Sequence, residues 1–211
     1  MENIEGLFSP PQNFAGLASP YADLKTARVV VLPVPYDSTT EWQSGTREGP
    51  QAIIDASQYL EFYDIELDRD IYDVGIHTLP KVQPVLSSPE KMIDRVYRIA
   101  SELAKQAKFL VMFGGEHSLS LGVVKALREN FHDLCVLQLD AHTDLRDEYL
   151  GTKYSHACVM RRIFELCHIV QVGIRSLSRE EQQFLTQNDL HPFYISTPSS
   201  VSASTESIIA R

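Results

Sequence analysis

The sequence has few cysteines, and their spacing matches neither a zinc-binding motif nor a disulfide framework. It contains three, Cys135, Cys158 and Cys167, and no CxxC pair. An odd number of dispersed cysteines argues against a disulfide scaffold and against a thiolate zinc site. We therefore expect small apolar thiols in the reducing environment of the cytoplasm.

The sequence also lacks the features of a membrane protein and of a nucleic-acid-binding protein. Residues 1–5 have no basic start, and no later stretch reaches the roughly 20 apolar residues of a membrane span. The 28 acidic and 19 basic residues give a formal net charge of -9, and no run of Lys and Arg forms a patch that could bind the phosphates of a nucleic acid. We expect a cytoplasmic protein with neither a membrane nor nucleic acid as partner.

With 211 residues and a hydrophobic share of 44%, the chain can enclose a substantial core. We expect one domain over residues 1–195. Residues 196–211 are rich in Ser and Thr and have little apolar pattern, so they are expected to form a loose tail.

Buried strands alternate with helical patterns along the expected domain. A helix over 88–107 is the clearest, because Ser88 can cap it and Pro89 suits its first turn. Strands are predicted at 28–33, 108–113, 134–139, 168–172 and 193–195, and further helices at 50–63, 118–130, 155–166 and 178–187. This alternation predicts an α/β fold, a parallel sheet with helices on both faces.

Two loops after predicted strands carry residues that can bind a metal. One strand runs into Gly114-Gly115-Glu116-His117-Ser118, and the next runs into Asp140-Ala141-His142-Thr143-Asp144. Ligands of parallel sheets gather at the carboxyl ends of strands, and in an extended segment Asp140, His142 and Asp144 project from one side. Oxygen and nitrogen donors without thiolate suit manganese or a similar divalent ion.

Each motif alone has an ordinary structural interpretation. A D-x-H-x-D string arises in polar loops, and His117 could cap the following helix. Their positions after consecutive strands favour the metal site. A doubly wound nucleotide-binding domain is disfavoured, because no G-x-G-x-x-G or G-x-x-x-x-G-K-[ST] motif follows a predicted strand.

Together, the two loops resemble two of the three signature motifs of the ureohydrolase (arginase/agmatinase) family. Gly45-Thr46-Arg47-Glu48-Gly49-Pro50 resembles the early glycine/arginine loop of that family. Tyr154-Ser155-His156-Ala157, followed by Met160-Arg161-Arg162, is similar to the agmatinase branch. The resemblance spans about residues 27–194 and implies an arginase-like three-layer sandwich whose C-terminal part is missing here.

The resemblance also implies a site and a reaction. Asp140 would bridge two Mn²⁺ ions, His117 and Asp144 would complete one, and His142 would bind the other. His156 would transfer protons near the substrate. The implied reaction is hydrolysis of agmatine to putrescine and urea by a metal-bridged hydroxide, as in putrescine and polyamine biosynthesis. Arginine, guanidinobutyrate and formiminoglutamate are other guanidino or related substrates, and a homotrimer or homohexamer is the implied assembly.

One family motif has no counterpart in the chain. The S-x-D-x-D type segment, which supplies two further aspartate ligands, is absent from the sequence. We expect reduced metal occupancy and little turnover, because cations need several donors. The alternative is a catalytically inactive relative that serves as a subunit or regulator of a complete enzyme.

Three further features have less specific interpretations. Arg47 either approaches substrate or forms a structural ion pair. Glu116 is expected to support the site at most, because neighbouring side chains of an extended loop point apart. Tyr59, Phe62 and Tyr63 fall on the helix predicted over 50–63 and are expected to pack in the core.

Overall fold

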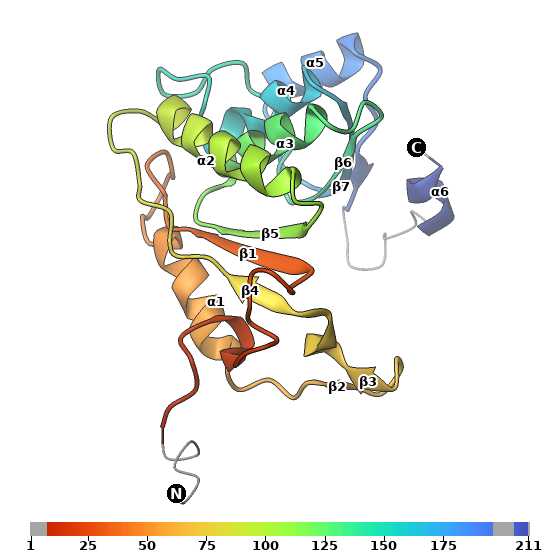
Figure 1. Ribbon diagram of the computed structural model, residues 1–211. Coiled ribbons are helices and arrows are strands. Elements are labelled where there is room, and N and C mark those ends of the chain that lie inside the picture. Colours follow the sequence, from red (N-terminus) through yellow and green to blue (C-terminus); the bar gives the residue numbers. More distant parts are fainter. Residues whose placement is uncertain (1–7, 196–204, 211) are drawn as a thin grey trace, which may run out of the picture. The chain divides into compact units, whose positions relative to one another are not determined.

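The computed structural model describes residues 8–195 and 205–210, which divide into two compact units. The first comprises Met1–Pro84 with Glu102–Glu116, and the second Val85–Ser101 with His117–Arg211. Each unit contains a three-stranded parallel sheet with associated helices (Figure 1). The predicted α/β class is confirmed.

The sheet of the first unit has the order β4-β1-β5. Strand β1 (Val29–Val34) is its centre and is almost fully buried, as its unbroken apolar run predicts. Helix α1 packs against β1 and β5. The other elements of this unit are β4 (Ile76–Thr78), β5 (Phe109–Gly114), α1 (Gly49–Ser57), the hairpin of β2 (Tyr63–Asp64) and β3 (Arg69–Asp70), and the 3-10 turns η2 (Phe14–Gly16), η3 (Thr46–Glu48) and η4 (Ile71–Val74).

The sheet of the second unit has the order β6-β7-β8, and helices α3 and α4 pack on each other beside it. Its core includes Leu145, Met160 and Ile163, each at most 1% exposed. The elements are β6 (Cys135–Leu139), β7 (His168–Ile174), β8 (Phe193–Tyr194), η5 (His117–Leu119), α3 (Ser120–Arg128), η6 (His156–Cys158), α4 (Val159–Phe164), α5 (Arg179–Gln187) and α6 (Thr205–Ile209).

Helix α2 (Pro89–Ala104) begins in the second unit and ends in the first. Its first turn has the predicted cap, because the Ser88 hydroxyl accepts a hydrogen bond from the Lys91 N–H at 3.2 Å. The tail expected over 196–211 lies largely outside the described residues, and its described portion contains α6. In the part of the chain that the structure describes, no helix is both long and apolar enough to span a membrane.

The helix predicted over 50–63 ends at Ser57, and the expected core packing of its aromatic residues is wrong for two of the three. Tyr59 is 89% exposed and Tyr63 is 54% exposed. The chain leaves the helix for the β2–β3 hairpin, whose turn is organised by Asp64. Its carboxylate accepts hydrogen bonds from the N–H groups of Glu66 and Leu67, both at 2.9 Å. Tyr63 pairs with Asp70 across this hairpin and therefore lies outside the helix.

Strand β6 is an apolar edge of its sheet. Among the described residues it pairs only with β7. Leu137 and Leu139 on β6 are 55% and 75% exposed. An open, apolar edge strand is a template for pairing with other chains.

Candidate metal centre

Gly115, the residue directly after β5, allows a close backbone contact. A Cβ added to Gly115 would lie 2.1 Å from the carbonyl oxygen of Tyr36, so no other residue fits without a shift. The next N–H, that of Glu116, donates to the same Tyr36 oxygen at 2.8 Å. The Glu116 carboxylate accepts from the Thr39 N–H at 2.6 Å and from the Thr39 hydroxyl at 2.7 Å. Glu116 therefore fastens the loop that follows β1.

Three of the four predicted metal ligands converge in the second unit. His117 Nδ1 lies 2.7 Å from Asp144 Oδ2 and 3.4 Å from Asp140 Oδ2. One ligand atom from each of these residues lies within 4.8 Å of the others. The cluster thus brings one imidazole and two carboxylates from separate loops within reach of one cation.

The two carboxylates raise the affinity of His117 for a proton. Burial of the imidazole lowers its pKa, but the hydrogen bond to Asp144 and the charges of Asp144 and Asp140 outweigh it, so the pKa of His117 is raised above its ordinary value. A cation that occupies the cluster therefore competes with protons for the His117 imidazole, because a histidine binds metal in its neutral form.

Asp144 reaches the cluster through a left-handed backbone conformation, and not through the extended conformation expected from the sequence. Its φ is +51°, in the left-handed region. The residues on either side are tied to Glu181 Oε1, which accepts from the Thr143 hydroxyl at 2.7 Å and from the Leu145 N–H at 2.9 Å. These bonds hold the turn that presents Asp144.

Glu181 is a buried carboxylate with a full set of donors. It is 5% exposed, and its Oε2 accepts from the Ser178 N–H at 2.7 Å, which completes a capping box at the start of α5. Burial raises its pKa, but the hydrogen bonds from Ser178, Thr143 and Leu145 together lower the pKa by more than burial raises it. The pKa of Glu181 therefore lies below its ordinary value. The group remains charged and orders both the helix and the loop.

Two buried glutamines hold the backbone of the same loop. Gln171 on β7 donates to the carbonyl oxygen of Thr143 at 2.8 Å and to Gln138 Oε1 at 2.5 Å. Gln138 on β6 donates to the carbonyl oxygen of His142 at 3.2 Å. The loop is thus fixed from the sheet and from α5.

Glu181, Gln138 and Gln171 lie outside the two metal-binding motifs of the sequence. The Ser178-x-x-Glu181 spacing, a capping-box signature, could have identified Glu181. Gln138 and Gln171 are polar residues in otherwise apolar strand patterns, and such residues need internal partners when buried.

His142 lies beside the cluster but outside it. Its backbone N–H donates to Asp140 Oδ1 at 2.9 Å, while its Nδ1 is 3.6 Å from the same oxygen. The His142 side chain is 62% exposed. Its role as a ligand to a second ion stays a prediction.

His156 begins η6, which lies beside η5, the turn that His117 begins. The His156 ring packs edge-on against Tyr149, with the ring centroids 6.0 Å apart. The fold therefore gathers the elements that carry both histidines, and the predicted proton transfer by His156 stays a prediction.

Arg47 forms a structural ion pair in the first unit. Its Nε donates to Asp37 Oδ1 at 2.5 Å, and Nη2 contacts the same oxygen. Asp37 Oδ2 accepts from the Gly45 N–H at 2.7 Å. Burial raises the pKa of Asp37, but Arg47 and the backbone donors bring the pKa below its ordinary value. Of the two interpretations of Arg47, the structural one is confirmed.

Comparison with known proteins gives consistent matches. A model of the arginase family matches residues 27–206. The N(1)-aminopropylagmatine ureohydrolase of Synechocystis sp. is 36% identical over 182 residues, which are 82% of this chain and 58% of that protein. The agmatinase of Bacillus subtilis is 32% identical, over 78% of this chain and 58% of that protein. The matches thus span less than two thirds of these curated relatives.

The fold agrees with a solved structure as well. The agmatine ureohydrolase of Thermoplasma volcanium superposes with a TM-score of 0.80 at 31% identity. The match covers 98% of this chain and 67% of that one. The predicted family and the predicted arginase-like α/β fold are confirmed by these similarities.

Proposed function

Because the chain belongs to the arginase family, we propose that it is built for metal-dependent hydrolysis of a guanidino group, with agmatine as substrate and putrescine and urea as products. The relatives named agmatinase and N(1)-aminopropylagmatine ureohydrolase support this substrate class. The observation that carries the proposal is the convergence of His117, Asp140 and Asp144. The proposed partner is therefore a small guanidino compound.

The donor set of the cluster fits a divalent cation. Imidazole nitrogen with carboxylate oxygen and no thiolate suits Mn²⁺, and arginase-family proteins generally carry a binuclear metal site. We assign one ion to His117, Asp140 and Asp144, and a second to Asp140 and His142. The chemistry that such ions supply when bound is acidification of water, whose pKa falls from about 15.7 towards 7.

The reaction also needs a proton at the leaving nitrogen. Water adds to the guanidinium carbon, the bond from that carbon to the alkyl-bearing nitrogen breaks, and the departing amine takes up a proton. We assign the proton delivery to the imidazole of His156, because an imidazole can act as a general acid towards a leaving amine. Glu181, Gln138 and Gln171 keep the loop between Asp140 and Asp144 in place.

We further propose that metal binding and turnover by these 211 residues are weak. Three converging donors are fewer than divalent ions with oxygen ligands usually take, about six or more. The competing proposal is an inactive subunit or regulator of a complete relative, supported by the same small number of converging donors among the described residues. A homotrimer or homohexamer in the cytoplasm is the assembly we propose in either case, and the three free cysteines fit a reducing compartment.

Calorimetric titration with Mn²⁺, followed by urea release from agmatine and N(1)-aminopropylagmatine, tests the proposal. We expect Asp144→Asn to abolish Mn²⁺ binding and urea release. Asp189→Asn is the matched control, because Asp189 is exposed and pairs only with His191 among the interactions described. Mn²⁺ binding without urea release would favour the inactive subunit, and unchanged binding in Asp144→Asn would refute the assigned site.

A further inference from the structure

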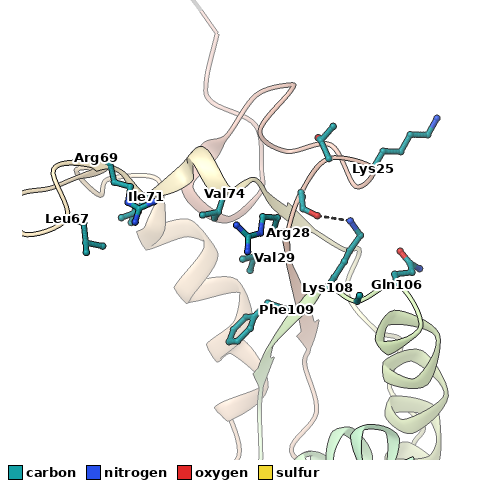
Figure 2. Close-up of a pocket in the computed structure, with 13 residues that line it drawn as sticks. Lys25, Arg28, Val29, Leu67, Arg69, Ile71, Val74, Gln106, Lys108 and Phe109 are labelled. Carbon is teal, nitrogen blue, oxygen red and sulfur yellow. Dashed lines mark hydrogen bonds between the residues drawn. The ribbon is translucent and has the colours of Figure 1, made fainter. Parts of the chain in front are cut away.

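A hollow lies in the first unit, at the end of the sheet where β1 and β5 begin, opposite to Gly114 and Gly115. It has a volume of about 730 Å³ and is bounded by the residues where β1 and β5 begin and by the β2–β3 hairpin (Figure 2). We call it the basal pocket. None of the predicted metal ligands lines it.

The basal pocket is positively charged in a protein whose net charge is -9. Lys25, Arg28, Arg69 and Lys108 line it, and no Asp or Glu does. Within the described ranges, no carboxylate lies within ion-pair distance of any of these four side chains. Their charges are therefore not neutralised locally.

The four basic side chains differ in how well they are placed to bind a ligand in the pocket. Lys108 Nζ donates to the carbonyl oxygen of Ala27 at 2.6 Å, and Lys25 extends away from the hollow (Figure 2). Arg28, at the start of β1, and Arg69, on the hairpin, stand on either side of the hollow in the same view. These two guanidinium groups offer planar donor forks that match carboxylate and phosphate oxygens.

Much of the remaining wall is apolar, and three of its large side chains are exposed to solvent. Phe109 is 70% exposed, Leu67 is 57% exposed and Ile71 is 42% exposed, and all three line the basal pocket. A concave apolar surface with a few convergent polar groups is typical of a small-molecule site.

We propose that the basal pocket binds a small organic anion, with its carboxylate or phosphate group between Arg28 and Arg69 and its apolar or aromatic body on Phe109 and Leu67. The two arginines supply the charge complementarity, and burial of the exposed phenyl ring adds apolar contact area. An inorganic anion satisfies only the arginines, and an uncharged aromatic satisfies only the apolar wall. The site therefore selects compounds that carry both groups.

Calorimetry on the 211-residue chain with four simple probes tests this selection. Phenyl phosphate is expected to bind at least tenfold more tightly than inorganic phosphate or phenol. Comparison with benzoate distinguishes a phosphate from a carboxylate ligand. Phe109→Ala is expected to reduce phenyl phosphate binding to the level of inorganic phosphate, whose own binding it leaves unchanged.

Charge removal tests the role of the two arginines. Arg28→Gln and Arg69→Gln are each expected to weaken phenyl phosphate binding about tenfold, the effect of one lost charge-assisted hydrogen bond. The matched control is Arg98→Gln, because Arg98 is an exposed arginine of α2 that pairs with Asp94. Arg28→Lys keeps the charge without the fork, so it should give an intermediate loss and serves if Arg28→Gln fails to fold.

Two outcomes would overturn the proposal. Equal binding by the Arg28→Gln, Arg69→Gln and Arg98→Gln variants would place the anion elsewhere on the protein. Absence of binding by all four probes at millimolar concentration, with a change of oligomeric state in Arg69→Gln, would identify the surface as a contact between protein chains.

Discussion

The buried carboxylate of Glu181 offers a direct test of how the metal loop is held. Its two oxygens accept from the Thr143 hydroxyl and from the N–H groups of Leu145 and Ser178. Glu181→Gln keeps the size of the side chain but replaces one accepting oxygen with an NH₂ group. The remaining oxygen of the amide can accept either from Thr143 and Leu145 or from Ser178. The amide NH₂ group then points at the N–H or O–H donor that has lost its acceptor.

The expected cost follows from these contacts. A hydrogen bond to a charged group contributes about 1.5–3 kcal/mol, and leaving a buried donor unpaired costs about as much. We expect the free energy of unfolding to fall by about 3 kcal/mol. With a urea slope of about 2 kcal/mol per M, the unfolding midpoint moves down by about 1.5 M.

The pH dependence of the same variant has a definite sign. The pKa of Glu181 is lowered in the folded protein, so its contribution is fully present above the ordinary value of 4.5 and is lost as pH falls through the lowered pKa. The stability difference between wild type and Glu181→Gln should be full at pH 7. It should shrink as the pH falls below 4.5 towards that lowered pKa.

Urea unfolding and Mn²⁺ calorimetry check this prediction together. Because the loop presents Asp144, we expect Mn²⁺ affinity to drop about tenfold or more, as with other groups that orient metal ligands. Glu102→Gln is the control, since Glu102 is exposed and forms a surface pair with Lys105, which is worth at most about 1 kcal/mol. A Glu181→Gln protein within about 0.5 kcal/mol of wild type would refute the reasoning.

Three further substitutions test the packing and the edge of the sheets. Gly115→Ala places a methyl group against the Tyr36 carbonyl oxygen, so we expect a loss of about 3 kcal/mol or more in urea unfolding; near-wild-type stability would contradict the close contact. Leu145→Ala, at a side chain with 0% exposure, should cost about 3–5 kcal/mol in the same assay, and a cost below 1 kcal/mol would show that the site collapses. Leu139→Lys, on the exposed edge of β6, should leave stability within about 0.5 kcal/mol and reduce self-association in light scattering, whereas unchanged association would exclude this edge as its cause.

Local sequence patterns determined most of the secondary structure. The apolar runs that became β1, β5, β6 and β7 and the amphipathic pattern of α2 are each set by residues close along the chain. The helix predicted over 50–63 was too long, because it ends at Ser57 and Tyr63 pairs instead with Asp70 in the β2–β3 hairpin. Helical periodicity alone does not register that strand pairing.

For the candidate site, the sequence by itself determined which donors are available and that two loops at strand ends carry them. Only the tertiary structure decided which of them meet. Asp144 turns towards His117 with a positive φ, while the His142 side chain stays exposed beside Asp140. That choice depends on Glu181 and Gln171, which lie about thirty residues or more along the chain from the loop they bind. Contacts at such separations form only when the chain has folded, so spacing within a motif does not encode them.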